Sequence, residues 1–222
     1  MMLGWAIVKK RNEKTFNKKK NEIMEISYDC YAEHGLAGTG IKTVMDACGM
    51  SKASIYTYFD SIDDLILQST AHFMIETELA YMRLAPKKIE DVDKFIDETP
   101  YWASKKYGKK YRLMYQIYTH PKYVDYGKKF FDGVNNRYIE YSETLEKNLG
   151  IPKDELLPLI FIFVNATIHY SVFEDDFYLK VQLQLVKMAM AQLSEKYLKK
   201  LTKLLLLLLI LITISIKIIV LY

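Results

Sequence analysis

The stretch that decides the fold is YAEHGLAGTGIKTVMDACGMSKASIYTYF, residues 31–59. Leading into it, Ile23, Ile26 and Cys30 recur at intervals of three and four, which places them on one face of a first helix. We expect that helix to stop at Gly35, because glycine readily adopts the left-handed conformation that follows many helix ends. The chain therefore enters the stretch as a helix with one apolar face.

Two shorter helices follow within the same stretch. Apolar residues from Ile41 to Cys48 keep the helical period for about two turns. A third helix is predicted to start after Ser51, whose hydroxyl can cap free backbone amides, and Ile55 and Phe59 give this helix an apolar side. Two short helices joined by a tight turn and braced by a longer helix form either a helix-turn-helix DNA-binding domain or an ordinary three-helix packing unit.

The residue types favour the first alternative. The stretch resembles the DNA-binding domain of the TetR family of transcriptional regulators, whose pattern is an aromatic residue with a glycine four positions later, a Thr or Ser before the second helix, an Ala-Gly-Val-Ser-like turn and Leu-Tyr-x-x-Phe. The matching residues are Tyr31, Gly35, Thr39, Ala47, Gly49, Ser51, Lys52, Ile55, Tyr56 and Phe59. The resemblance implies an all-α protein, in which an N-terminal three-helix helix-turn-helix domain precedes a helical ligand-binding and dimerisation domain.

The resemblance and the residue types together give a set of expected DNA contacts. A helix fits the major groove, where Ser, Thr, Lys and Tyr side chains can bond base edges or phosphates. The expected DNA-binding residues are Thr39, Lys42, Thr43, Ser51, Lys52, Ala53, Ser54, Tyr56, Thr57 and Tyr58. Gly40 stands where many family members have a second hydroxyl, which leaves Thr39 as the expected capping or phosphate-binding side chain. Ile62 stands where a phosphate-binding Lys is common.

Composition fits an all-α chain and gives no sign of catalysis. The 222 residues are 50% hydrophobic with Gly 9 and Pro 5, which favours helices over a turn-rich β fold. Two cysteines, Cys30 and Cys48, are too few for a disulfide framework, and no Cys or His spacing is typical of zinc. Because the sequence has no Gly-rich phosphate loop and no GxSxG or HExxH motif, we expect no enzyme activity, no metal and no cofactor.

Positive charge gathers near the start of the chain. Residues 9–20 hold seven Lys and Arg against Glu13 alone, seven positive charges less one negative. The block is either a solvated segment or an arm attracted to DNA phosphates, and in the second case it offsets the missing cation at Ile62. The apolar residues 1–8 precede the charges, which is the reverse of the order in a secretory signal.

A long fourth helix is predicted from the Ser-x-x-Asp pattern of Ser61 and Asp64, which is similar to a capping box, as far as about Ala85. In the resembled family this helix links the DNA-binding domain to a ligand-responsive core. Its tilt then sets the distance between the two DNA-binding domains of a dimer, which must match half-sites about 34–36 Å apart.

Aromatic residues crowd residues 86–135, which we expect to belong to the ligand-sensing part. Four tyrosines from Tyr107 to Tyr118 fall on one helical stripe, which is typical of a packed core and also of a bundle that encloses a cavity. The candidate effector-binding residues are Trp102, Tyr111, Met114, Tyr115, Tyr118, Phe163 and Tyr170. His120 and His169 are isolated and are expected to be surface or core residues rather than metal ligands.

Two further helices are predicted over residues 153–173 and 177–200. Apolar residues cover more of the first than one normal stripe, so this helix needs a partner surface. In the resembled family the last two helices of each subunit form a four-helix interface, which implies a symmetric homodimer through residues 153–200. The break Glu174-Asp175-Asp176 is either a solvated turn or a set of carboxylates for a cationic ligand.

The C-terminal tail, residues 204–222, is apolar apart from a few small polar residues and Lys217. As a helix it would span about 28 Å, close to the hydrocarbon core of a bilayer, and the lysines before it favour the cytoplasmic side. The tail is a candidate membrane anchor. The alternatives are a buried helix and a low-complexity sequence from an altered reading frame.

Together these features predict a cytoplasmic transcriptional regulator, a ligand-responsive repressor that binds a palindromic operator in double-stranded DNA as a homodimer. Its partners would be a small-molecule effector and, through the tail, the cytoplasmic side of a membrane. The alternative is a membrane-attached interaction protein that keeps a helix-turn-helix shape. The expected domains are a basic arm (1–20), a helix-turn-helix domain (21–66), an effector-binding and dimerisation domain (67–203) and the tail (204–222).

Overall fold

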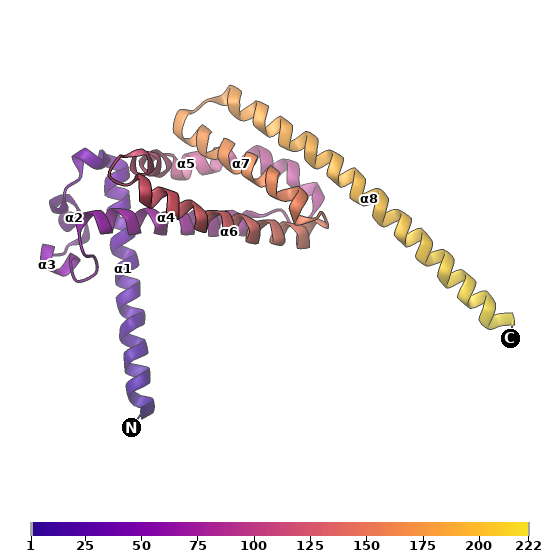
Figure 1. The fold of residues 1–222 in the computed structure, drawn as a ribbon, viewed down its shortest axis with the longest axis horizontal. Helices are drawn as coiled ribbons and strands as arrows, with labels where there is room; N and C mark the ends of the chain where they lie inside the picture. Colours follow the sequence, from indigo (N-terminus) through magenta and orange to yellow (C-terminus); the bar gives the residue numbers. More distant parts are fainter. Residues whose placement is uncertain (1, 222) are drawn as a thin grey trace. The chain divides into compact units, whose positions relative to one another are not determined.

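The computed structural model describes the backbone of residues 2–221 and the side chains of residues 13–127, 133–200 and 202–209. Over residues 2–221 the regular structure is helical and contains no strand (Figure 1). In chain order the helices are α1 (Met2–Gly38), α2 (Ile41–Cys48), α3 (Lys52–Ile55), α4 (Ile62–Leu84), the short 3-10 helix η1 (Ile89–Asp91), α5 (Val92–Thr119), α6 (Val124–Leu149), α7 (Lys153–Phe173) and α8 (Asp176–Leu221). The predicted all-α fold is confirmed.

Two glycines, Gly35 and Gly49, interrupt or end the N-terminal helices at the predicted positions. Gly35 has φ 75°, which interrupts the helical backbone of α1. Gly49 has φ 62° and ends α2, with its amide donating to the carbonyl of Met45. A residue with a Cβ has a steric cost in this left-handed region, so glycine permits the interruption of α1 at residue 35 and the end of α2 at residue 49.

Capping groups fix the starts of α3 and α4. The Ser51 hydroxyl accepts a hydrogen bond from the amide of Ser54 at 3.1 Å, as the sequence predicts. The Ser61 hydroxyl accepts from the amide of Asp64 at 3.0 Å, and the Asp64 carboxylate accepts from the amide of Asp60 at 3.0 Å. Each cap is worth about 1 kcal/mol because it pairs an amide that the helix leaves free.

Two boundaries differ from the sequence prediction. The expected basic arm is continuous with α1, whose backbone is helical from Met2, although the side chains of Lys9, Lys10 and Arg11 lie outside the described residues. The last helix runs on to Leu221, well past the predicted end, because no glycine or proline follows residue 200 to stop it.

The chain divides into two compact units. The first unit comprises Met1–Leu84, Trp102–Arg137 and Ser171–Glu174, and the second comprises Ala85–Tyr101, Tyr138–Tyr170 and Asp175–Tyr222. Each unit therefore combines segments that are distant in the sequence. The functional division expected after residue 66 stays a prediction, since α4 as a whole belongs to the first unit.

Aromatic packing forms part of the core in both units. In the first unit the ring of Tyr28 on α1 stacks on Phe73 of α4 at a centroid distance of 4.9 Å, and Tyr111 of α5 meets Phe73 edge-on at 5.5 Å. In the second unit Phe95 of α5 lies 5.2 Å from Phe163 of α7. Contacts of this kind add to the free energy gained by burying the rings.

Candidate nucleic-acid interface and effector cavity

The short helix α3 has a buried side that anchors it and an exposed side that is free to bind. Ile55 is 0% exposed and Phe59, just beyond the helix, is 2% exposed, so these two side chains hold the segment against the rest of the first unit. Lys52, Ala53 and Thr57 are exposed on other sides of the segment. The small side chain at position 53 lets the helix approach another surface closely, as contact with a groove requires.

Hydrogen bonds within residues 51–57 make this segment compact. The hydroxyls of Ser51 and Ser54 lie 2.8 Å apart, and the hydroxyl of Thr57 donates to the Ser54 carbonyl at 2.6 Å. The Lys52 ammonium lies 5.8 Å from the ring centroid of exposed Tyr56, a distance at which a cation and a ring attract each other. The polar side chains are thereby ordered by contacts within the segment itself.

The structure places Thr39 away from the surface. Its side chain is 5% exposed, and its hydroxyl donates to the Cys30 carbonyl at 3.3 Å. The N-cap of α2 is Gly40, which receives no capping hydrogen bond from a side chain. The expected capping role of Thr39 is therefore wrong, because the hydroxyl joins the segment before α2 to α1 instead. Lys42 is exposed and Thr43 half-buried at the start of α2.

Contacts from α1 reach the end of the α3 segment, and the sequence analysis missed them. The ring of Phe16 stacks on Tyr58 at a centroid distance of 4.6 Å with an interplanar angle of 24°. The Lys20 ammonium lies 5.2 Å from the Phe59 ring centroid. The available signal was spacing, since Phe16 stands seven residues before Ile23 and so extends the apolar face of the first helix.

The cysteines and histidines show no sign of a reactive or metal site. Burial raises the pKa of the thiols of both Cys30 and Cys48, which lowers their reactivity at neutral pH. The amide of Lys122 donates to Nδ1 of His120 at 3.1 Å, and Nε2 of His169 lies 3.8 Å from the Asp175 carboxylate. In the part of the chain that the structure describes, no group of three or more His, Cys, Asp or Glu is arranged to hold a metal ion.

The acidic break between α7 and α8 is exposed at all three residues. The Asp175 carboxylate accepts a hydrogen bond from the amide of Tyr178 at 2.9 Å and so caps the start of α8. Of the two alternatives for this segment, the geometry favours a solvated turn.

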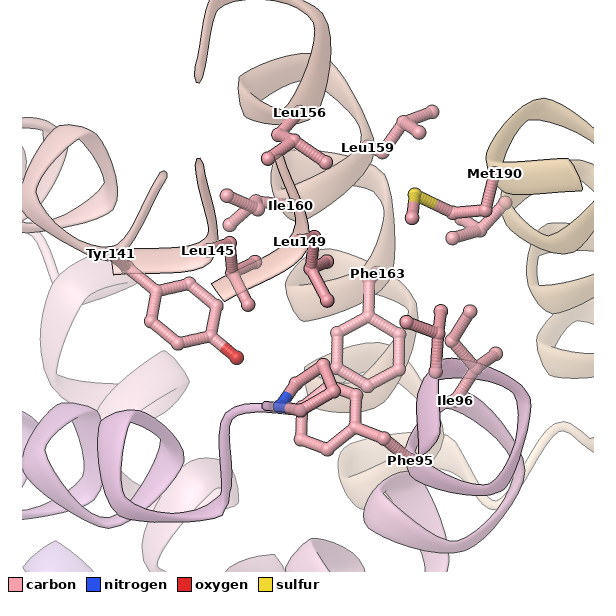
Figure 2. A pocket seen from close by; sticks show the side chains of 13 residues that line it. Phe95, Ile96, Tyr141, Leu145, Leu149, Leu156, Leu159, Ile160, Phe163 and Met190 are labelled. Carbon is pink, nitrogen blue, oxygen red and sulfur yellow. The ribbon is translucent and has the colours of Figure 1, made fainter. Parts of the chain in front are cut away.

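An apolar cavity lies within the second unit, with a volume of about 410 Å³ that includes its mouth. Figure 2 shows its side chains converging from α5, α6, α7 and α8. It is lined by Pro86, Val92, Phe95, Ile96, Tyr141, Leu145, Leu149, Leu156, Leu159, Ile160, Phe163, Val186 and Met190. None of these side chains is charged, so the cavity suits an apolar molecule or the apolar part of one.

The candidate effector residues do not all gather at this cavity. Phe163 lines it. Tyr170 is in the same unit and meets Tyr101 edge-on at a centroid distance of 5.2 Å. The other five belong to the first unit, where Tyr111, Met114 and Tyr118 are buried, Trp102 is half-buried and Tyr115 is 38% exposed. The tyrosine stripe is thus partly core, and the lining of the cavity is mostly aliphatic.

An exposed apolar face runs along the start of α8. Phe177, Val181, Leu185 and Met188 recur at helical spacing and are 80%, 47%, 49% and 57% exposed. Exposed Gln184 shares this side of the helix, seven residues after Phe177 and four before Met188. A row of large apolar side chains of this kind is typical of a surface that is buried on association.

One helix of the described residues, α7, has the length and apolar composition to cross a membrane. Nearly half of its apolar window, 44%, is buried inside the protein, as in the core helix of a helical bundle. The expected anchor is a different segment. Residues 204–209 are exposed, and the side chains of residues 210–222 lie outside the described residues.

Comparison with known proteins gives matches of two kinds. The family model described as bacterial regulatory proteins, tetR family, matches residues 23–68. YerO, an uncharacterised HTH-type transcriptional regulator of Bacillus subtilis, is 33% identical over 58 residues, which are 26% of this chain and 20% of that protein. The sequence match thus spans a fifth of the length of the curated relative.

Solved structures resemble the chain over a longer part of its length. A transcriptional regulator from Streptomyces coelicolor A3(2) superposes with a TM-score of 0.60 at 15% identity, over 78% of this chain and 98% of that one. FadR of Bacillus subtilis, solved in complex with stearoyl-CoA, gives a TM-score of 0.48 at 12% identity, over 78% of this chain and 96% of that one. At these identities the first superposition shows a shared fold, while the sequence resemblance is confirmed for residues 23–68.

Proposed function

Because the N-terminal domain of the chain belongs to the TetR family, we propose that the protein is a transcriptional regulator that binds operator DNA through α3. The main support for this proposal is the arrangement of the side chains around α3. The segment over residues 51–58 is anchored by Ile55 and Phe59 and presents Lys52, Tyr56 and Thr57 to solvent. An anchored helix with exposed polar and cationic side chains has what contact with base edges and phosphates requires.

In this proposal, α1 contributes phosphate contacts beside α3. The stack of Phe16 on Tyr58 fixes this part of α1 against the end of the α3 segment. Lys14 and Lys18, on either side of Phe16, are exposed. These cations supply charge near the DNA-binding segment that the start of α4 lacks, where Ile62 stands. Thr39 is left out of the proposed contacts because its hydroxyl is buried.

Selection of duplexes from a random pool by the full-length protein tests DNA binding without knowledge of the operator. The proposal predicts enrichment of sequences with two inverted half-sites about one helical turn apart. Tyr58→Phe and Lys52→Ala should weaken binding to the selected duplex, whereas Lys87→Ala, which removes an exposed lysine of the second unit, should not. A pool that shows no enrichment, or equal binding by all variants, would count against the proposal.

The proposed regulator acts as a homodimer through residues 153–200. The exposed row from Phe177 to Met188 supports this part of the proposal, because burying it against a second copy removes apolar area from water. Two copies related by twofold symmetry match the two inverted half-sites of a palindrome.

The proposed effector has an apolar part that enters the cavity of the second unit. A molecule that binds one arrangement of the dimer better than the other shifts the population between DNA-bound and free protein. With n-octanol as the test molecule, binding should raise the melting temperature of the full-length protein. Leu145→Phe, which adds volume to the lining, should reduce that rise; a rise that this variant leaves unchanged would place the alcohol elsewhere.

A repressor role is proposed from the family resemblance. A reporter gene whose promoter contains the selected sequence should be expressed less when the protein is present. The Lys52→Ala variant, produced at the same level, should restore expression. Higher expression in the presence of the intact protein would instead indicate an activator.

The alternative function, a membrane-attached interaction protein, rests on the apolar sequence of residues 204–222. Co-sedimentation with vesicles of phosphatidylcholine and phosphatidylglycerol separates the alternatives. An anchor predicts that the full-length chain sediments with vesicles and that a chain ending at Lys203 does not. Equal behaviour of both chains would remove the membrane hypothesis.

A further inference from the structure

A second cavity, within the first unit, is lined by residues of α1, α4 and α5 and has different chemistry from the apolar one. Its volume is about 590 Å³ with the open mouth included. Three carboxylates, those of Glu25, Asp29 and Glu76, and one ammonium, that of Lys110, belong to its lining. His72 also lines the cavity, with its Nε2 3.3 Å from the Glu25 carboxylate. The three carboxylates outnumber the one ammonium, which favours a cationic occupant.

Aromatic rings form one wall of this cavity. Phe73 stacks on Tyr28 at a centroid distance of 4.9 Å, and Tyr107 approaches Phe73 edge-on at 5.9 Å. The Lys110 ammonium lies 5.9 Å from the Phe73 ring centroid and pairs with the Asp29 carboxylate. The wall already holds one cation of the chain itself, so its rings and carboxylates are arranged in a way that attracts an ammonium group.

Ser69 supplies an independent sign of a ligand. Its side chain lines the cavity, is 1% exposed, and has a hydroxyl with no hydrogen-bond partner in the structure. Two other hydroxyls of α4 behave differently, since those of Thr70 and Thr77 donate to the carbonyls of Ile66 and Phe73 at 2.7 Å. A buried hydroxyl without a partner costs free energy, and a ligand that hydrogen-bonds to it recovers that cost.

We propose that this cavity binds a small aromatic ammonium ion. Its ring packs against Phe73 and Tyr107, and its ammonium group is balanced by Glu25 and Glu76 and donates to the Ser69 hydroxyl. The site is separate from the apolar cavity, and binding there does not depend on the proposed role in transcription. A ligand held here contacts α1 and α4 together, so it strengthens the packing of the helix-turn-helix domain on α4.

Isothermal titration of the full-length protein tests the site, with 2-phenylethylammonium as the test cation and 2-phenylethanol as its neutral analogue. The cation should bind about fivefold or more tightly than the alcohol, because only the cation gains from the negative lining. Equal affinity for both molecules, or no heat of binding with the cation at millimolar concentration, would overturn the proposal.

Two substitutions with opposite expected effects on affinity test whether the cation binds in this cavity. Glu76→Gln removes one exposed carboxylate and should weaken binding of the cation by about fivefold. Lys110→Gln removes the competing ammonium and should tighten binding by a similar factor. Glu140→Gln, an exposed carboxylate that does not line the cavity, is the matched control and should leave affinity unchanged. If both lining variants bind the cation as the control does, the cavity is not the site.

Discussion

The exposed face of the α3 segment and the exposed face of α8 differ in chemistry more than in exposure. Lys52, Tyr56 and Thr57 present an ammonium and hydroxyls, whereas Phe177 and Val181 present hydrocarbon. The polar face keeps its hydration until it meets a charged or hydrogen-bonding surface, while the apolar face gains free energy by leaving water. The contrast shows that the residue types of an exposed surface, and the contacts that anchor that surface, indicate what kind of partner binds there.

The largest effect is expected where the α3 segment is anchored. Ile55 is fully buried, so Ile55→Ala should lower the free energy of unfolding by about 3 kcal/mol through lost burial and a new cavity. Urea denaturation followed by circular dichroism measures this change. Lys52→Ala, a neighbouring exposed position, is the control and should unfold like the wild type. Equal stability of the two variants would mean that Ile55 does not anchor the segment.

A slightly smaller effect is expected on the α8 face. Leu185→Lys places a charge where the proposed dimer buries hydrocarbon, and the dimer dissociation constant should rise by about a hundredfold. Sedimentation velocity over a range of protein concentrations measures it. Gln116→Lys adds the same charge at an exposed residue of α5, outside the proposed interface, and should leave the dimer intact. If both variants stay dimeric, this face is not the interface.

Loss of one cation from the α3 face should have a moderate effect that depends on salt. If Lys52 contacts phosphate, Lys52→Ala should reduce the slope of log affinity against log salt concentration by about 1. Fluorescence anisotropy with the selected duplex at several salt concentrations gives the slope. Lys87→Ala should preserve it. A slope that Lys52→Ala leaves unchanged would exclude phosphate contact by this residue.

The smallest effect is expected on the pH dependence of stability, through a contact near the start of α4. The Lys122 ammonium at 2.7 Å and the Tyr123 hydroxyl at 2.6 Å hold the pKa of the Asp63 carboxyl below its ordinary value of 3.8. A lowered pKa in the folded protein stabilises it above pH 3.8, and this contribution is lost as the pH falls through the folded pKa. Asp63→Asn should therefore unfold more easily than wild type at pH 7, with the difference shrinking toward pH 3. A difference that stays constant with pH would rule out the charge as its cause.

The sequence was most informative where a local pattern determines local structure. Ser51 and Gly49 set the ends of α2 and α3 through hydrogen bonds and backbone angles that involve only near neighbours, so both were predictable. The end of α8 was not predictable in this way, because residues 201–221 contain neither glycine nor proline to mark it.

The sites that depend on contacts between distant segments were predicted less well. Thr39 was expected at the surface, yet its hydroxyl lies against the Cys30 carbonyl, which only the packing of α2 on α1 reveals. The apolar cavity combines residues from 86 to 190, and its mostly aliphatic lining carries no sequence motif that distinguishes it from ordinary core. Of the seven candidate effector residues, only Phe163 is part of that lining.

Nuclease protection of the DNA upstream of the gene for this protein, with the full-length chain in moderate salt, tests whether a dimer binds DNA through the α3 segment. We predict two protected half-sites about one helical turn apart, lost with Lys52→Ala together with Tyr58→Phe and weakened with Leu185→Lys. Protection that persists in all of these variants, or protein that protects no specific sequence there or in the selected duplex, would contradict a dimeric regulator that binds DNA through the α3 segment.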